Sequence, residues 1–274
     1  MKFKSLQCLL AVSATLAAAS SASSAVYDGF ETYTPTNPLA TNNGGTGWSA
    51  AWAGSGPAST QTISIDDPNG LIDGGDQAAL LSPSGSPGEI ASRTFTPISG
   101  GTVYLSMLFR VSNWDSGDFL LFQLTDGQVN NTTQSLGFGL RNSGSGPFFA
   151  RSGSSSGGQT VNSGTNVAND TDYLLVAAFS LVGGEYEKID LYLNPTDPTL
   201  ATESPLVSAS ASNPNMTQLS KFTVRVANSE GDESVYFDEL RISDNLADVF
   251  VPEPSALALL GFGGLLLARR RRAF

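Results

Sequence analysis

Apolar and polar residues alternate along several stretches in the middle of the chain, which is the pattern of half-buried β-strands. The stretch 102–111 places five apolar side chains on one face: Val103, Leu105, Met107, Phe109 and Val111. The stretch 188–194 turns Ile189, Leu191 and Leu193 inward and Lys188, Asp190, Tyr192 and Asn194 outward, and the stretch 221–226 buries Phe222, Val224 and Val226. Further strands are predicted at residues 61–66, 78–82, 89–95, 119–125, 136–141, 148–151, 173–181 and 234–242.

Gly- and Ser-rich segments such as 143–147 and 152–158 separate these strands, and no amphipathic helix of ordinary length lies between them. About ten antiparallel strands without an internal repeat or a clear linker predict one all-β domain, a two-sheet jelly-roll sandwich. We place this domain at residues 26–248, between a signal segment at 1–25 and a tail at 249–274. We expect a signal helix before it and a short transmembrane helix after it.

The first 25 residues have the three parts of a secretory signal peptide. Lys2 and Lys4 supply the positive charge, residues 6–19 form the apolar stretch, and residues 23–25 are the small residues at which a signal peptidase would cut. The only cysteine, Cys8, is lost with this segment, so the mature chain is expected to contain no disulfide.

The C-terminal residues combine a proline-containing motif, an apolar stretch and an arginine cluster. In order, these are Val251, Pro252, Glu253 and Pro254, then residues 255–268, then Arg269, Arg270, Arg271 and Arg272. The apolar stretch of about 14 residues is shorter than the roughly 20 that cross a bilayer comfortably. A buried core helix is the alternative, but it would not end in four arginines. We therefore expect a short transmembrane helix that the arginines hold at the cytoplasmic face.

This order of features resembles the PEP-CTERM sorting signal, and the resemblance covers about the last 24 residues. It implies that Val251, Pro252, Glu253 and Pro254 are recognised by an exosortase, a membrane protease that resembles a transpeptidase. It also implies a route: export, a transient anchor in the inner membrane, and then delivery to the cell surface or the extracellular matrix. The motif is in that case a substrate for another enzyme and not a catalytic site of this chain.

Composition removes several kinds of chemistry. The chain contains no histidine, which excludes Ser-His-Asp triads, imidazole bases and histidine-ligated zinc or copper sites. Without the two ends, 8 basic and 24 acidic residues remain, a net charge of −16. Such a surface repels nucleic acid and anionic lipid headgroups. It either attracts divalent cations or serves solubility.

The central domain resembles the concanavalin A-like lectin and glucanase jelly rolls, also called LamG-like. The resemblance rests on the segments 27–31, 44–52 and 236–242, which read YDGFE, GGTGWSAAW and YFDELRI. It covers the whole mature domain loosely. That superfamily includes glycan binders, glycosidases and modules without a known ligand, so the fold alone supplies no function.

A retaining glycosidase needs two carboxyl groups about 5–5.5 Å apart. The nearest candidates are Glu185, Glu187 and Asp190, but Glu187 and Asp190 are three residues apart and point to opposite faces of a strand. The run from Glu230 to Glu233 is typical of an acidic turn. We therefore expect no catalytic residues and no enzyme activity.

A glycan-binding face needs exposed aromatic side chains with polar neighbours. The candidates for glycan contact are Trp48, Trp52, Asp190 and Tyr192. Trp48 and Trp52 alternatively pack on the edge of the sandwich, because they lie in a Gly-rich segment. Tyr192 is the better surface candidate, since the strand pattern turns it outward beside Asp190.

In several carbohydrate-binding jelly rolls, an early carboxylate and one in the last strand share a structural calcium ion. Glu31 and Asp238 occupy comparable places here, which makes them a candidate calcium site. The alternative is that both are ordinary strand-end or surface carboxylates. We expect no other cofactor.

The leading hypothesis is a non-enzymatic surface or matrix protein that contacts extracellular polysaccharide. A carbohydrate-active enzyme with a diverged site and a structural spacer without a ligand are the two alternatives.

Overall fold

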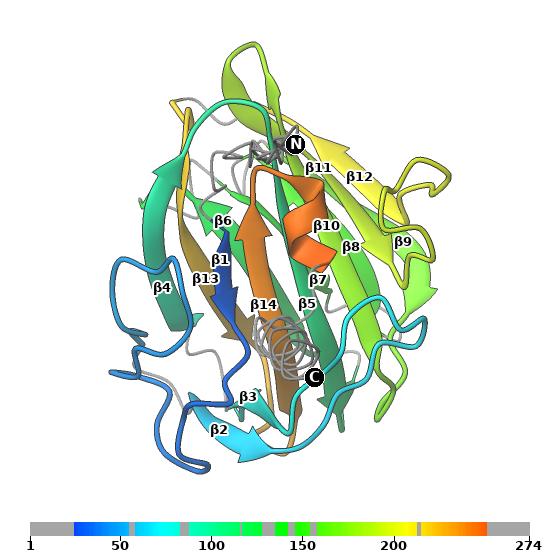
Figure 1. Cartoon of the computed structure of the whole chain (residues 1–274). Helices are drawn as coiled ribbons and strands as arrows, with labels where there is room; N and C mark the ends of the chain where they lie inside the picture. Colours follow the sequence, from blue (N-terminus) through cyan, green and yellow to red (C-terminus); the bar gives the residue numbers. More distant parts are fainter. Residues whose placement is uncertain are drawn as a thin grey trace, which may run out of the picture.

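The computed structural model describes residues 25–54, 58–82, 88–115, 117–127, 135–141, 146–153, 158–212 and 215–250. These residues form two packed antiparallel β-sheets with the core between them (Figure 1). The predicted two-sheet antiparallel sandwich is confirmed. The predicted signal helix and the predicted C-terminal transmembrane helix lie outside the described residues. Within the described residues, no helix has the length and apolar character needed to cross a membrane.

One sheet has eight strands, and seven of them run in the order β12-β11-β10-β5-β14-β3-β2, with β1 paired to β14. Their bounds are β1 Val26–Asp28, β2 Ala58–Thr62, β3 Gln77–Leu81, β5 Thr102–Ser112, β10 Tyr173–Val182, β11 Glu185–Leu193, β12 Val207–Ser210 and β14 Ser234–Ser243. All these pairs are antiparallel.

The other sheet has six strands in the order β4-β13-β6-β7-β8-β9. Their bounds are β4 Gly88–Ile98, β6 Phe119–Thr125, β7 Leu136–Leu140, β8 Pro147–Ser152, β9 Gln159–Asn166 and β13 Leu219–Ala227. The chain crosses between the sheets repeatedly, so strands far apart in sequence become neighbours: β13 pairs with β4 on one side and with β6 on the other.

The core between the sheets is built by the alternating residues. Phe122 of the six-stranded sheet meets Phe109 and Phe237 of the eight-stranded sheet in edge-on contacts, with ring centroids 5.8 Å apart in both cases. The inward side chains predicted on β5 and β13 are buried, as are Ile189 and Leu191 on β11. Because successive strand residues point to opposite faces, these positions also fix which side chains lie on the outer face of each sheet.

A second apolar cluster lies on the outer face of the eight-stranded sheet. The 3₁₀ helix η1 (Leu246–Phe250) packs Val249 and Phe250 there against Leu108, Leu174 and Val176. The Ser106 hydroxyl donates a hydrogen bond to the Val249 carbonyl at 2.6 Å. The described fold therefore continues to Phe250, two residues beyond the domain end predicted at 248.

Candidate anion-binding face

The sequence predicts its most specific site in the C-terminal tail. Val251, Pro252, Glu253 and Pro254, and also Arg269, Arg270, Arg271 and Arg272, lie outside the described residues. The described chain ends at Phe250, on the outer face of the eight-stranded sheet.

Trp48 and Trp52 belong to a buried network around Asp28. The Asp28 carboxylate accepts hydrogen bonds from Trp52 Nε1 at 2.8 Å, the Tyr33 hydroxyl at 2.7 Å and the Arg93 guanidinium at 2.5 Å. Trp52 is 2% exposed, so its ring has no open face for a sugar. Trp48 is half-buried, and its ring centroid lies 4.7 Å from the Arg93 guanidinium carbon. Both tryptophans therefore pack at the edge of the sandwich, which was the alternative interpretation of their sequence.

Arg93 ties the N-terminal loop to the edge of the six-stranded sheet. Its Nε donates to the Ala50 carbonyl at 2.8 Å, and its second terminal nitrogen donates to Asn43 and to the Gly44 carbonyl, each at 2.9 Å. These contacts, together with Asp28, satisfy the donors of a side chain that is buried. This network therefore has a structural role, because it holds the N-terminal loop over β4.

Asp190 and Tyr192 lie on β11, in the other sheet. Asp190 accepts hydrogen bonds from Lys188 Nζ and the Ser208 hydroxyl, both at 2.6 Å. Tyr192 is half-buried against the second apolar cluster, and burial raises the pKa of its hydroxyl. The four side chains predicted to contact glycan thus form two separate groups, on β11 of one sheet and over β4 of the other. Their contact with glycan stays a prediction.

The predicted calcium ligands Glu31 and Asp238 are brought to one place. Asp238 accepts a hydrogen bond from the Gly75 amide at 3.2 Å, and Glu31 accepts one from the Gln77 amide at 2.9 Å. Burial raises the pKa of Asp238 well above its usual range, and the charges of Glu239 and Glu31 raise it further. The meeting of Glu31 and Asp238 fits the expectation, and calcium at this place stays a prediction.

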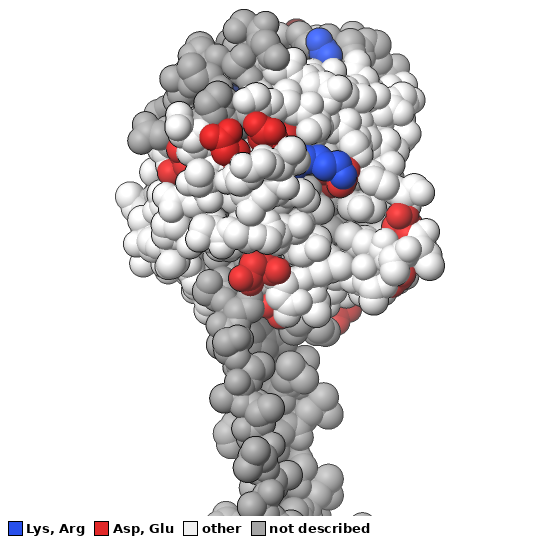
Figure 2. Space-filling model, turned by 90° about the horizontal axis from the view of Figure 1, so that it is seen from above, with Lys and Arg blue, Asp and Glu red and all other residues white. Residues whose placement is uncertain are grey.

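Half of the basic side chains of the domain form ion pairs with carboxylates among the described residues. Four of the eight form ion pairs: Arg93 with Asp28, Arg110 with Asp172, Lys188 with Asp190, and Arg241 with Glu239. This pairing is expected where acidic residues outnumber basic ones three to one. Figure 2 shows acidic side chains scattered over one end of the molecule with few basic ones among them.

Three of the remaining basic side chains are arginines that lie on the same surface. Arg225 alternates on β13 with the core residues Val224 and Val226, so it points to the outer face of the six-stranded sheet. Arg151 on β8 follows the core residue Ala150, and Arg141 follows Leu140 at the end of β7. We call these three side chains the arginine face. Within the described part of the chain, none of them forms an ion pair, and in the strand register Arg225 lies opposite Glu89 of β4.

Strand register brings the three arginines together. Arg225 lies opposite Leu121, which lies opposite Gly139 on β7. In the next row, Gln123 lies opposite Gly137, which lies opposite Arg151. Neighbouring strands are about 4.8 Å apart, so the three intervals from β13 to β8 span about 14 Å.

Gly137 and Gly139 leave the centre of the arginine face without side chains. A Cβ atom on Gly137 would lie 2.2 Å from the Phe122 carbonyl oxygen, and one on Gly139 would lie 2.0 Å from the Leu120 carbonyl oxygen. Only glycine fits both positions without a backbone shift. Phe119 and Phe149 pack beside them with ring centroids 5.6 Å apart, and the Arg225 guanidinium lies 5.8 Å from the Phe119 centroid.

The three positive charges of the arginine face repel one another. Burial lowers the pKa of Arg151, and the positive charges of Arg225 and Arg141 lower it further. Arg151 Nε is buried and has no hydrogen-bond partner. A guanidinium is pre-shaped to bind a carboxylate through two parallel hydrogen bonds. An anion placed on this face would relieve the repulsion among the three charges.

The sequence alone does not predict the arginine face. The alternation in 221–226 already turns Arg225 outward, which is the one local signal. The meeting of Arg225 with Arg141 and Arg151 depends on the pairing of β13, β6, β7 and β8, which is a long-range property of the fold.

The fold and the tail together define the class of this protein, an exported all-β sandwich with a sorting signal. The tail matches the PEP-CTERM protein-sorting motif over residues 250–272, as the sequence predicts. No curated protein sequence matches the chain.

Several solved structures resemble the sandwich. The endo-β-1,4-glucuronan lyase from the fungus Trichoderma reesei is 13% identical, with 79% of this chain and 98% of that chain covered and a TM-score of 0.49. The alginate lyase Aly36B is 12% identical, with 81% and 97% covered and a TM-score of 0.49. The carbohydrate recognition domain of Emp47p is 9% identical, with 81% and 96% covered and a TM-score of 0.45.

Proposed function

We propose that this protein is a non-enzymatic component of the cell surface or extracellular matrix that binds an acidic polysaccharide on its arginine face. The observation that carries the proposal is the gathering of Arg141, Arg151 and Arg225 on one sheet face without an ion pair among the described residues. In the proposed pathway an exosortase-type protease recognises the tail after a signal peptidase has removed the leader.

A uronate polysaccharide suits this face better than a duplex nucleic acid does. Its carboxylates are planar and repeat along an extended chain, so several can meet guanidinium groups spread over about 14 Å of sheet. The domain as a whole carries a net charge of −16, which opposes the approach of any polyanion and most of all that of a densely charged duplex. Binding is therefore expected to depend on short-range contacts at the arginine face.

The chemistry of the face supports binding without catalysis. The outward positions of β6, β7, β8, β9 and β13 that the structure describes include no carboxylate and no tyrosine, and the chain contains no histidine. The carboxylate of the neighbouring strand β4 that lies opposite Arg225 in the register is Glu89. Hydrolysis of a glycosidic bond uses a pair of carboxyl groups, and proton abstraction uses a basic side chain near the operating pH. The outward residues instead offer guanidinium, amide and hydroxyl donors.

The test is equilibrium binding of the purified protein to polygalacturonate, with neutral dextran as the ligand control. Arg225→Gln removes one charge from the face and is expected to weaken binding at least about tenfold, which corresponds to about 1.4 kcal/mol for one charged hydrogen-bonding contact. Lys188→Gln is the matched control, because it removes the same charge from the other sheet, and its affinity is expected to stay within about twofold. Wild-type affinity is expected to fall as salt is added.

Equal losses in Arg225→Gln and Lys188→Gln would show that net charge alone governs binding and would contradict the proposal. Release of oligosaccharide products from the polygalacturonate would favour the enzyme alternative. Tighter binding of duplex DNA than of polygalacturonate would assign the face to a different partner.

A further inference from the structure

Two loops that cross between the sheets meet at one end of the sandwich. Residues 113–118 connect β5 to β6, and residues 228–233 connect β13 to β14. The Asn113 side-chain amide donates to the Asp232 carbonyl at 3.0 Å, which joins the two loops. The two loops are acidic and contain Asp115, Asp118, Glu230, Asp232 and Glu233.

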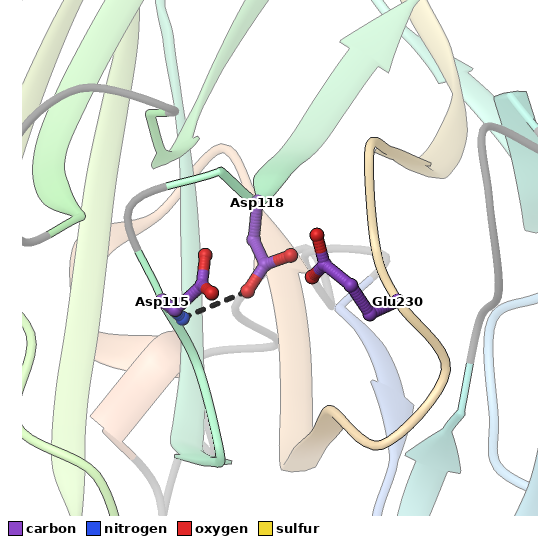
Figure 3. A group of neighbouring side chains, drawn as sticks. All are labelled: Asp115, Asp118 and Glu230. Atoms are coloured by element: carbon purple, nitrogen blue, oxygen red, sulfur yellow. Dashed lines mark hydrogen bonds between the residues drawn. The ribbon is translucent and has the colours of Figure 1, made fainter.

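Three of these carboxylates point toward one another. Figure 3 shows Asp118 between Asp115 and Glu230, with all three side chains directed into the same space. One oxygen of each lies within 4.8 Å of the others. Two oxygens that bind one calcium ion at about 2.4 Å are at most about 4.8 Å apart, so the spacing fits a shared ion.

Asp118 supplies a second observation. Its side chain is fully buried, and its Oδ2 accepts a hydrogen bond from the Asp115 amide at 2.8 Å. Its other oxygen, Oδ1, is also buried and has no hydrogen-bond partner. A buried carboxylate oxygen without a partner costs free energy, and no basic side chain forms an ion pair with any of the three carboxylates within the described residues.

A further carboxylate, that of Glu233, shapes the loop that presents Glu230. Glu233 is buried and accepts hydrogen bonds from the backbone amides of Glu230 at 2.9 Å and Gly231 at 2.8 Å. On the opposite loop, Asp115 Oδ1 accepts the Gly117 amide at 2.6 Å. Both loops are thus held by their own hydrogen bonds, and the oxygens that face the shared space are pre-positioned.

We propose that Asp115, Asp118 and Glu230 bind a calcium ion that clamps the β5–β6 loop to the β13–β14 loop. The ion supplies the missing partner of Asp118 Oδ1. Burial raises the pKa of Asp118 to about 7, and the charges of Glu233, Asp115 and Glu230 add to this rise.

The donor set favours calcium over other metals. All three donors are carboxylates, and hard oxygen ligands select calcium or magnesium over zinc and copper. Donors from two irregular loops suit the flexible coordination of calcium better than the strict octahedron of magnesium. Two of the three carboxylates are exposed, so water completes the coordination and the affinity is expected in the extracellular range of about 10⁻⁴–10⁻³ M.

The clamp also bears on the arginine face. Phe119 directly follows Asp118, and Ala227, the last residue of β13, lies opposite it. A calcium ion between the two loops therefore holds the end of the β6–β13 pair that carries Arg225. This proposal does not depend on polysaccharide binding and is tested without it.

The experiment is calorimetric titration of the chelator-treated, purified protein with calcium chloride, paired with thermal unfolding in calcium and in excess chelator. Wild type is expected to bind and to unfold at a higher temperature in calcium, because an ion that binds only the folded state stabilises it. Asp118→Asn keeps an acceptor for the Asp115 amide but removes the charge, and at least a tenfold loss of affinity is expected. Glu230→Gln changes an exposed side chain and is expected to show the same loss.

Glu31→Gln is the control, because it alters the other candidate calcium site and leaves these loops intact. It is expected to retain the binding that Asp118→Asn loses. Should Asp118→Asn fail to fold, Glu230→Gln decides the question. Absence of calcium binding in wild type, or wild-type affinity in Glu230→Gln, overturns the proposal.

Discussion

At the scale of single residues, the molecule uses its few positive charges in two different ways. Arg93 is buried, and its donors are satisfied by Asp28, Asn43 and three carbonyl or hydroxyl oxygens. Arg151 is half-buried among positive charges, and its Nε has no partner. Arg93 therefore has a structural role, whereas the charge of Arg151 lies on the outer face of the sheet without a counter-ion among the described residues.

The buried pair makes a stability prediction. Asp28→Asn leaves Arg93 charged and buried without its counter-ion, so we expect a loss of about 3–5 kcal/mol in the free energy of unfolding. Lys188→Met, which breaks the ion pair with Asp190 at a side chain that is 44% exposed, is expected to cost less than about 1 kcal/mol. Urea unfolding of both variants measures the difference. Similar losses in the two would mean that the Asp28 network is not a buried anchor.

Residue type in the sequence identified the tryptophans and the carboxylates as candidates, and the fold shows which of them lie near one another. The alternative of edge packing for Trp48 and Trp52 matches their contacts, because Asp28 and Arg93 supply partners from distant segments. The juxtaposition of Glu31 and Asp238 was foreseen from the expected nearness of the first and last strands. The acidic run from Glu230 to Glu233 forms an acidic turn as expected, but its meeting with Asp115 and Asp118 was not foreseen.

At the scale of elements, alternation predicted the strands that have one apolar face. The predictions at 102–111, 173–181 and 234–242 match β5, β10 and β14 to within a residue or two at each end. The prediction at 61–66 is displaced, since β2 covers Ala58–Thr62. Each well-predicted strand buries one face against the other sheet, and that burial is what makes the pattern visible.

Three strands were not predicted, and each lacks that pattern. β9 (Gln159–Asn166) is an edge strand of polar residues in which only Val161 packs against the core. β1 and β12 have three and four residues, too few to show a period. Such strands are held by pairing with a neighbour and not by their own composition, so the sequence alone gives no signal for them.

Local sequence patterns likewise do not predict the order of the strands in a sheet. β13 inserts between β4 and β6 although about a hundred residues separate it from either, and this insertion places Arg225 on the same sheet as Arg151. The arginine face is therefore a product of topology. Its residues could be predicted as outward one at a time, but their proximity could not.

At the scale of the whole molecule, the sorting tail and the arginine face belong to separate parts of the protein. The tail matches the PEP-CTERM protein-sorting motif, and the domain presents the arginine face, where we propose that the ligand binds. The described fold reaches Phe250 and packs it against the outer face of the eight-stranded sheet, while the arginine face belongs to the other sheet. In the proposed pathway, attachment through the tail leaves the six-stranded sheet free for the proposed ligand.

A chain truncated after Phe250 tests the sorting role. It keeps η1 and the second apolar cluster, so its thermal unfolding is expected to equal that of the mature protein. Cell fractionation is expected to show the full chain at the membrane and the surface, and the truncated chain released in soluble form. Identical distribution, amount and processed size of the two chains would contradict the sorting assignment.

The most direct test of the binding account is chemical-shift mapping of backbone amides during titration with a galacturonate oligosaccharide. The account predicts that the largest shifts fall on β6, β7, β8 and β13 and decrease in Arg151→Gln. Shifts confined to the surroundings of Trp48 or Tyr192, or no shifts at millimolar ligand, would contradict it.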